Sequence, residues 1–321
     1  MIRLDLSDTT SFMAHRSGWG YCMSKLKRFH SKNGIKFNDF IEKDFGWNIN
    51  NYYNIGESNY KKYNYDWVGV WHNPPKYPDW FDVSNSPQAI LKRDIFQKSL
   101  KNCKAIVCLS EYLSNWLSER IDTPIVTVKH PTEIPASKWD IKNYLKSDRK
   151  QVIQVGYWLR KMDSIHNLRC SLDYEKIWLP SNKEYAINLF DILKKTLMGC
   201  KESHYTWSGV NMKRVSNEEF DSLLSGGVVF LDQYDSSANN AVVESVARNT
   251  PILTNRLPAV EEYIGKDYPL FFDDLDHASA LLSSPQKIYE AHLYLKNMDK
   301  RWISGTFFAN DLMTKLSKTI Q

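Results

Sequence analysis

Residues 227–256 read GVVFLDQYDSSANNAVVESVARNTPILTNR. Within this stretch Val228–Leu231 is a short, continuous apolar run, which is typical of a parallel strand buried on both faces. The small and polar residues 232–237 end that strand. A helix follows, because Asn239 or Asn240 can cap its N-terminus and the next residues favour helical structure. The stretch therefore predicts a buried strand, a polar loop and a helix in succession.

The end of that helix is marked by Asn249-Thr250-Pro251, since a residue that precedes proline disfavours helical geometry. Ile252-Leu253-Thr254 begins the next predicted strand. The alternation continues along the chain. Further strands are predicted at 2–6, 35–41, 67–71, 105–109, 125–128, 152–155, 177–179 and 270–272, and helices at 18–29, 87–100, 110–120, 184–197, 275–282 and 287–318. Alternating strands and helices in both halves predict an α/β protein with two Rossmann-like, doubly wound domains.

The irregular, polar stretch 131–149 predicts the linker between the two domains. We therefore expect an N-terminal domain over 1–148 and a second domain over 149–285. A C-terminal helix over 286–321 is expected to pack back across both. Ligands of doubly wound sheets bind beyond the carboxyl ends of the strands. If the two domains face each other, this rule predicts a ligand site in the cleft.

The loop that precedes the helix of the opening stretch is a natural place for an anion. Backbone N–H groups at a helix N-terminus lack partners within the helix, and the helix dipole favours negative charge there. Glu244 lies about one turn inside the helix. A carboxylate at this position suits the paired hydroxyl groups of a ribose.

This stretch resembles the donor-binding segment of GT-B glycosyltransferases, in particular the retaining "glycosyl transferases group 1" family. The family pattern is an acidic residue, seven others, a second Glu, and a Gly-Thr-Pro or Asn-Thr-Pro turn before a strand. Here Glu244 and Asn249-Thr250-Pro251 match. Ser236 stands in the place of the first Glu, with Asp235 one residue away. The resemblance implies that Asp235, or Ser236 with Ser237, makes the contact to the donor sugar.

Two other segments carry the resemblance. AIVCLSEYL, residues 105–113, is similar to the strand and Ser-Glu pair that close the family's N-terminal domain. VIQVG, residues 152–156, is similar to the first strand of the donor domain, where a Gly, an Arg and a Lys approach the donor diphosphate. Gly156, Arg160 and Lys161 take these places, although the family usually separates the two basic residues. Glycine permits close backbone approach, Arg binds phosphate through two hydrogen bonds, and Lys provides a point charge.

Residues of the N-terminal half complete the predicted site. Gly18, before a helix, resembles the family's glycine loop. His72 ends a strand, and the resemblance implies a contact to the transferred sugar; a structural histidine with satisfied hydrogen bonds is the alternative. His15 is a further candidate for lining the cleft. An inverting enzyme needs a protein base, for which Asp8, His15 and His72 are candidates.

The expected activity is transfer of a hexosyl or pentosyl group from a nucleotide-sugar to a glycan, lipid-linked or protein-linked acceptor. The expected nucleotide is UDP or GDP. The acceptor is assigned to the N-terminal domain and the nucleotide to the second. Glu244 is expected on the ribose. Arg160 or Lys161, with loop amides at Asn239, Asn240 and Ala241, is expected on the diphosphate. These groups stabilise the leaving group electrostatically, so no cofactor and no metal are expected. The resemblance implies a retaining reaction.

Composition limits the other classes of function. Lys and Arg number 42 and Asp and Glu 37, giving a net charge of +5, a small excess typical of a solvated surface. The Trp and Tyr residues lie mainly in apolar segments and do not interleave with a basic stripe, so no nucleic-acid partner is expected. Five cysteines without a CxxC pair and no leader-like segment favour a cytoplasmic location. Peripheral contact with a membrane through the Lys-rich C-terminal helix is the second expectation for location.

Two alternatives to a GT-B transferase remain open at this point. One is a non-catalytic glycan- or nucleotide-binding protein on the same scaffold, for which Ser236 in place of Glu is the indication. The other is a metal-dependent GT-A transferase, which needs an Asp-x-Asp at a strand end. Residues 273–276, DDLD, contain that spacing late in the chain.

Overall fold

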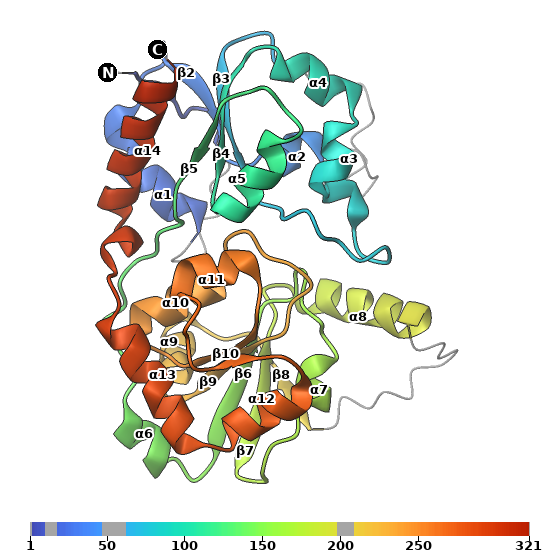
Figure 1. Ribbon diagram of the computed structural model, residues 1–321, viewed down its shortest axis with the longest axis vertical. Coiled ribbons are helices and arrows are strands. Elements are labelled where there is room, and N and C mark those ends of the chain that lie inside the picture. The colour runs from blue at the N-terminus through green and yellow to red at the C-terminus, as the bar shows by residue number, and fades with distance from the viewer. Residues whose placement is uncertain (1, 10–17, 47–61, 198–208, 321) are drawn as a thin grey trace. The chain divides into compact units, whose positions relative to one another are not determined.

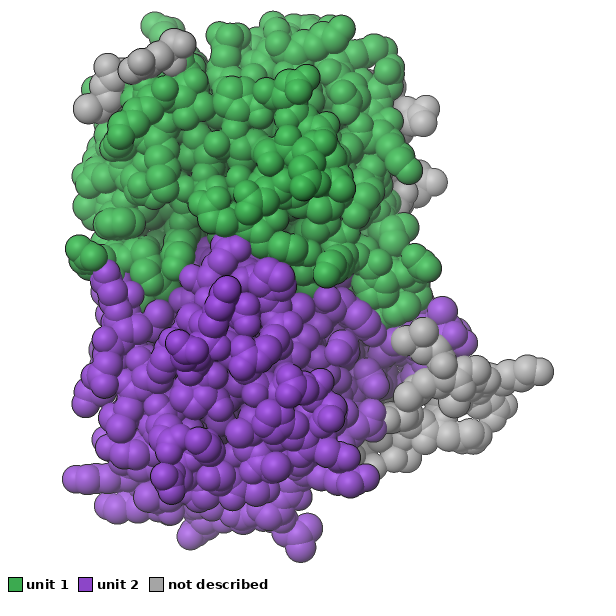
Figure 2. Space-filling model, in the orientation of Figure 1, with its two compact units in different colours: residues 1–133, 235–240, 301–321 green, residues 134–234, 241–300 purple. Residues whose placement is uncertain are grey.

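The computed structural model describes residues 2–9, 18–46, 62–197 and 209–320. The chain forms two compact units (Figure 2). Unit 1 comprises residues 1–133, 235–240 and 301–321, and unit 2 comprises residues 134–234 and 241–300. The change from unit 1 to unit 2 therefore comes after Glu133, not after the predicted residue 148. Unit 1 also takes up a short loop, 235–240, and the C-terminal segment.

Unit 1 contains a parallel sheet in the order β1-β2-β3-β4-β5. These strands are β1 Leu4–Asp5, β2 Ile35–Asn38, β3 Trp67–Trp71, β4 Cys103–Cys108 and β5 Ile125–Thr127. Its helices are α1 Trp19–Leu26, α2 Ile41–Phe45, α3 Pro87–Leu91, α4 Asp94–Leu100, α5 Glu111–Ser118 and α14 Gly305–Thr319, with 3-10 turns η1 Lys27–Phe29, η4 Val83–Asn85 and η5 Arg301–Ile303. Helices α1 and α14 lie side by side (Figure 1).

The core of unit 1 has one layer on each face of this sheet. Successive side chains of a strand point to opposite faces. Accordingly, Val68 and Val70 of β3 pack with residues of α1 and α14. Trp67 and Trp71 of the same strand pack instead with residues of α2, α4 and α5. Helices therefore cover both faces, as expected of a doubly wound sheet.

Unit 2 contains a parallel sheet in the order β11-β10-β9-β6-β7-β8. The strands are β6 Lys150–Val155, β7 Tyr174–Leu179, β8 Val210–Met212, β9 Val228–Leu231, β10 Ile252–Asn255 and β11 Phe271–Phe272. The helices are α6 Ile141–Lys146, α7 Ser164–Asn167, α8 Lys183–Leu197, α9 Asn217–Gly226, α10 Asn240–Arg248, α11 Pro258–Ile264, α12 Leu275–Leu282 and α13 Pro285–Asn297. The chain builds the sheet outward from β6 in one direction, then restarts at β9 on the other side of β6. The switch point of this topology lies between β6 and β9.

The predicted fold class is confirmed, since both units are α/β with parallel sheets. Strands 67–71 and 228–231 and helix 275–282 have the predicted bounds. The helix of the opening stretch ends as predicted. Asn249 adopts φ 62°, and the backbone N–H groups of Asn249 and Thr250 donate to Val246 O and Ser245 O, which is the Schellman arrangement of a helix C-terminus.

Several predicted elements were wrong in extent. The strand predicted at 35–41 ends at Asn38, and the helix predicted at 87–100 is split into α3 and α4. The irregular stretch 131–149 contains α6, whose N-terminus is capped by the side chain of Asp140.

The single helix predicted at 287–318, within the segment 286–321, is two helices. Met298 is extended after α13, and Ser304 caps α14 through the Phe307 N–H. A side-chain cap and an extended residue stop and restart the helix locally, which apolar periodicity alone does not reveal. Within the described ranges, the chain has no helix both long and apolar enough to cross a membrane.

Candidate functional site

The carboxyl ends of β6 and β9 lie next to each other in unit 2 and carry two loops that pair. Arg160 and Gln233 form an isolated antiparallel bridge. The Lys161 N–H donates to Asp232 O at 2.8 Å, and the Tyr234 N–H donates to Leu159 O at 3.0 Å. Ligands of doubly wound sheets bind outside the carboxyl ends of the strands at the switch point. These paired loops are therefore the candidate ligand site of unit 2.

The loop after β6 has an unusual backbone. Gly156 has φ +76°, and Leu159 has φ 52° although it is not glycine. Left-handed conformations at non-glycine residues are uncommon and cluster at functional sites. Gly156 is held from both sides, since its N–H donates to Leu179 O and its carbonyl accepts from Trp178 Nε1, each at 2.9 Å. The turn directly after the strand is thus fixed by β7.

The Arg160 side chain braces this turn. Its Nε donates to Val155 O at 3.2 Å, and its Nη1 donates to Trp158 O at 3.0 Å and to Gln233 Oε1 at 2.9 Å. The residue is buried, and this burial lowers the pKa of the guanidinium to about 10. A Cβ at Gly156 would stand 3.6 Å from Arg160 Nη2, so the guanidinium lies alongside the glycine. The donors at Nε and Nη1 serve the two loops.

The Lys161 side chain is the more accessible basic group. Its ammonium lies 2.9 Å from Asp232 Oδ1, and it is 40% exposed against 6% for the Asp232 side chain. Asp232 Oδ2 also accepts from Ser164 Oγ at 2.7 Å. The carboxylate is held from both sides, whereas the ammonium keeps an open side. Of the two basic residues predicted for the diphosphate, Lys161 has the geometry to meet a ligand.

Sequence reasoning did not select Asp232, Gln233 or Asn255. Gln233 exchanges two hydrogen bonds with Asn255, from its N–H to Asn255 Oδ1 at 3.0 Å and from Asn255 Nδ2 to its carbonyl at 2.9 Å. All three residues stand at the carboxyl ends of β9 and β10. A signal was present, since polar residues directly after neighbouring parallel strands meet at one edge of the sheet.

Glu244 lies in α10 and is buried, as are Ala241 and the rest of the helix from Ala241 to Arg248. Its Oε2 stands 3.9 Å from Arg248 Nη1. Arg248 in turn donates from Nη2 to Asp221 Oδ1 at 2.5 Å. Glu244, which is predicted to bind the ribose, therefore belongs to a row of three charged side chains within unit 2.

The loop 235–240 belongs to unit 1, although it joins β9 to α10. The buried Asp235 uses both carboxylate oxygens there. Its Oδ2 accepts from the Lys76 N–H at 2.8 Å and from the Tyr112 hydroxyl at 3.0 Å, and its Oδ1 accepts from the Ser236 N–H at 2.9 Å. Burial raises the pKa of Asp235, and these hydrogen bonds oppose the rise. Asp235 is an anchor of the loop, and its predicted contact to a sugar stays a prediction.

The other predicted residues of this loop come after Asp235 in the sequence. Ser237 Oγ lies 3.2 Å from Oγ of Ser110, which caps α5. Ser236, Ser237 and Asn239 are buried, and Asn240 is exposed. The structure thus brings Asp235, Ser236 and Ser237 together in unit 1, and it brings Gly156, Arg160 and Lys161 together in unit 2.

His72 is engaged on both sides of its ring. Its Nδ1 accepts from Trp19 Nε1 at 3.3 Å, and its Nε2 therefore carries the proton that it donates to Asp39 O at 2.8 Å. Phe40 stacks on the ring with centroids 4.1 Å apart. Burial lowers the pKa of His72 to about 3, so the ring is neutral. These contacts favour the structural alternative for His72 over a base or a sugar ligand, because neither ring nitrogen is left to meet a substrate.

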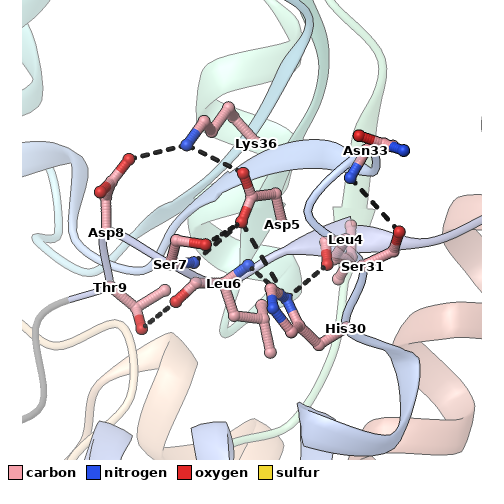
Figure 3. A network of polar contacts seen from close by, with 10 residues as sticks. All are labelled: Leu4, Asp5, Leu6, Ser7, Asp8, Thr9, His30, Ser31, Asn33 and Lys36. Atoms are coloured by element: carbon pink, nitrogen blue, oxygen red, sulfur yellow. Dashed lines mark hydrogen bonds and ion pairs between the residues drawn. The ribbon is translucent and has the colours of Figure 1, made fainter.

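The remaining predicted residues of unit 1 are Gly18, Asp8 and His15. Gly18 precedes α1 as its N-cap residue and has φ −86°, so no left-handed turn forms there. Asp8 pairs with Lys36 at 2.8 Å, and Lys36 also pairs with the buried Asp5 at 2.9 Å (Figure 3). The Asp8 side chain is 77% exposed. His15 lies outside the described residues.

The Asp-x-Asp spacing at 273–276 has a structural role. Asp274 caps α12 by accepting from the His277 N–H at 2.7 Å, and Asp276 faces Arg169 at 3.5 Å. No group of three or more His, Cys, Asp or Glu side chains in the described part of the chain is arranged to hold a metal ion. The structure gives no support to the GT-A alternative, because both units carry parallel sheets of the doubly wound kind.

Solved structures share this fold. A structure of S. aureus TarM in complex with fondaparinux, alpha-GlcNAc-glycerol and UDP aligns with a TM-score of 0.58 at 12% identity, over 92% of this chain and 58% of TarM. The trehalose-6-phosphate synthase OtsA aligns with a TM-score of 0.57 at 10% identity, over 93% of this chain and 76% of OtsA. Anabaena HepE in complex with UDP and glucose aligns with a TM-score of 0.58 at 10% identity, over 79% of this chain and 72% of HepE.

No protein-family model and no curated protein matches the chain by sequence. The chain spans less than two thirds of the length of TarM. At these identities the likeness shows the fold alone. The fold is that of the GT-B glycosyltransferases, with two parallel-sheet α/β units.

Proposed function

We propose that the protein is a glycosyltransferase that moves a sugar from a nucleotide-sugar to a glycan, lipid-linked or protein-linked acceptor. The observation that carries this proposal is the pair of loops at the switch point of unit 2. There Gly156 turns in a left-handed conformation and Lys161 presents a partly exposed ammonium. A glycine turn next to a cation suits a diphosphate, because the backbone can approach the phosphates closely and the cation balances their negative charge.

The proposed role of each residue is supported by its setting in its unit. Lys161 contacts the diphosphate, while Arg160 stabilises the loop through its hydrogen bonds. Glu244 binds the ribose hydroxyls. Amides at Asn239, Asn240 and Ala241, at the start of α10, add positive potential for the phosphates.

The chemistry that these groups support is electrostatic. As the bond from the sugar to the diphosphate breaks, negative charge grows on the leaving phosphate, and Lys161 and the helix N-terminus stabilise it. In the retaining reaction, the leaving phosphate oxygen takes the proton of the acceptor hydroxyl as that hydroxyl attacks on the same face. This route needs no protein base, which agrees with the engaged ring of His72. It also needs no cofactor and no metal.

UDP is the first nucleotide to test. The TarM and HepE structures contain UDP, and related trehalose-phosphate synthases of the same fold are UDP-forming enzymes. Hexosyl donors come before pentosyl donors for the same reason, since HepE is described with glucose. GDP and its sugars form the second set.

Binding can be measured by thermal unfolding with UDP, GDP, ADP, CMP and dTDP in the presence of EDTA. A ligand at a hundredfold over its Kd adds about 2.7 kcal/mol to the free energy of unfolding. We expect one nucleotide to stabilise the protein and Glu244→Ala to abolish the effect. The matched control is Glu290→Ala, since Glu290 is a carboxylate on α13 that pairs with Lys287 at the surface. Stabilisation by no nucleotide would contradict the proposal.

A non-catalytic nucleotide- or glycan-binding protein is the second candidate. The observation that favours it is Asp235, whose two oxygens are both taken by donors of unit 1 while Ser236 stands in the place of the expected Glu. Release of UDP from UDP-glucose, measured with and without the wild-type protein, separates the two candidates. An inverting transferase is the third, and loss of turnover in Asp8→Asn with nucleotide binding retained would favour it.

A further inference from the structure

A buried guanidinium links two carboxylates within unit 2. Arg248, the last residue of α10, donates from Nη2 to Asp221 Oδ1 of α9 at 2.5 Å. Its Nη1 lies 3.9 Å from Glu244 Oε2 and donates to the Glu244 carbonyl at 3.1 Å. The side chains of Arg248, Glu244 and Asp221 are 1%, 9% and 19% exposed. The three charges therefore interact with little screening by water.

The spacing in the helix explains how Arg248 reaches Glu244. Residues four apart lie on the same face of a helix, and side chains lean toward the N-terminus of the helix. Arg248 therefore extends back over the turn that carries Glu244. Asp221 fixes the far side of the guanidinium, and the ring of Phe220 lies 5.5 Å from its central carbon. The guanidinium is thus held in one place before any ligand arrives.

A cation buried this deeply is unfavourable unless it is paired. Arg248 is fully buried, and its Nε has no hydrogen-bond partner among the described residues. Lys138 donates to the Ala247 carbonyl nearby, so it caps the helix and adds a second positive charge on that side. With a second cation nearby, the guanidinium depends on both carboxylates to balance its charge. Of the two carboxylates, Glu244 is the one that lies in α10.

We propose that Arg248 is a positioning residue of the nucleotide site, which holds the Glu244 carboxylate as an anion in the orientation that accepts hydrogen bonds from the two vicinal hydroxyls of the ligand's ribose. Asp221 supports this role by fixing the guanidinium. The inference rests on the proposed function, because it assigns to Glu244 the ribose of a nucleoside diphosphate. It adds that ribose recognition depends on a residue that does not touch the ligand.

The ligand itself offers a readout that a general structural role would not move. UDP and 2′,3′-dideoxy-UDP differ only in the two hydroxyls. Affinities of both are measured by isothermal titration calorimetry for the wild type and for Arg248→Met, Arg248→Lys, Asp221→Asn and Glu244→Gln. If GDP is the nucleotide that binds, the two ligands compared are GDP and 2′,3′-dideoxy-GDP. Arg169→Met is the matched control, because the side chain of Arg169 is 83% exposed and faces Asp276.

We expect the wild type to bind UDP at least tenfold more tightly than the dideoxy analogue. Arg248→Met is expected to weaken UDP about tenfold and the dideoxy analogue less than twofold. Arg248→Lys keeps the charge but cannot span both carboxylates, so it restores part of the preference. Asp221→Asn is expected to fall between the wild type and Arg248→Met, and the Arg169 control to match the wild type.

The outcomes separate the inference from the proposed function. Equal weakening of both ligands by Arg248→Met, or no weakening of either, overturns the role of Arg248 while Glu244→Gln still reports on the ribose site. A wild type that binds neither UDP nor GDP overturns the proposed function and the inference together. If Arg248→Met fails to fold, Arg248→Lys and Asp221→Asn decide the matter, and an unchanged preference for UDP in both overturns the inference.

Discussion

The hydroxyl of Tyr112 donates a hydrogen bond to Oδ2 of Asp235 at 3.0 Å, across 123 residues of sequence. Together with the Lys76 N–H, it ties the loop 235–240 to unit 1. The loop precedes α10, whose first turn is proposed to bind phosphate. A residue that sequence reasoning placed on the donor sugar is thus held by an α5 side chain and by the backbone after β3.

Tyr112→Phe is predicted to loosen this loop. A hydrogen bond to a charged group contributes about 1.5–3 kcal/mol, so the free energy of unfolding should fall by about 2 kcal/mol at pH 7, measured in urea. The Tyr112 hydrogen bond lowers the pKa of Asp235 against the effect of burial, so its loss raises that pKa further. Tyr289→Phe, at an exposed tyrosine of α13, is the control. Equal losses in the two variants would contradict the anchoring role.

Glu42→Gln is predicted to change how stability depends on pH. Burial raises the pKa of Glu42 from 4.5 to about 7, although its Oε1 accepts from the N–H groups of His72 and Asn73. Between these pH values the folded state binds more protons than the unfolded state, so stability falls as pH rises through that window. The rise in pKa corresponds to roughly 3 kcal/mol.

The measurement for this prediction is urea unfolding of both proteins at pH 4.5, 6 and 8. Glutamine keeps the carbonyl acceptor and carries no charge. We expect the variant to gain stability relative to the wild type as pH rises from 4.5 to 8. A difference between the two proteins that stays constant over this range would show that Glu42 does not titrate there.

Gly156→Ala is predicted to strain the turn after β6. The cause is the backbone conformation at φ +76°, since the nearest atom to an added Cβ is Arg160 Nη2 at 3.6 Å, an ordinary contact. A left-handed conformation costs roughly 1–2 kcal/mol for a residue other than glycine. We expect a loss of stability of this size and a weaker affinity for UDP, measured by titration calorimetry. Gly226→Ala is the control, because a Cβ there meets nothing within 4 Å. Unchanged UDP affinity would show that the turn does not face the ligand.

Lys36→Met is predicted to destabilise unit 1 at neutral pH and to make its stability less dependent on acid. Burial raises the pKa of Asp5, but hydrogen bonds from Ser7 and Lys36 outweigh it and lower the pKa from 3.8 to about 2. The stabilisation is therefore present above pH 3.8 and is lost as pH falls toward 2. Removal of Lys36 should cost about 2 kcal/mol at pH 7, and the gap to the wild type should narrow below pH 4.

The control for this network is Asp8→Asn, since Asp8 shares Lys36 but is exposed. Exposed ion pairs contribute about 0–1 kcal/mol. Urea unfolding at pH 7 and pH 3 measures both variants. A loss in Asp8→Asn as large as that in Lys36→Met would contradict the assignment of the stabilisation to the buried Asp5.

Local signals in the sequence closely determined the strand, helix and strand of the stretch 227–256 in unit 2. The apolar run 228–231 became β9, and Asn249-Thr250-Pro251 ended α10 with Asn249 in a left-handed conformation. These features depend on a few neighbouring residues, so periodicity and terminator residues suffice to predict them. The α/β class followed from the same alternation. The break between α13 and α14 was missed, because it depends on the extended residue Met298 and on the side-chain cap from Ser304.

By itself, then, the sequence determined the fold class, the strand–loop–helix unit at 228–248, and the glycine and basic residues after β6. Only the tertiary structure decided what those residues contact. The order β9-β6 brings Arg160 to Gln233 and Lys161 to Asp232 across about 70 residues. Arg160 thereby joins the two loops, and its predicted contact to phosphate stays a prediction. Likewise, Asp235 became an anchor and His72 a neutral, satisfied ring. Such roles depend on which distant strands and loops pack together, and the free energy of that packing is not encoded in any local pattern.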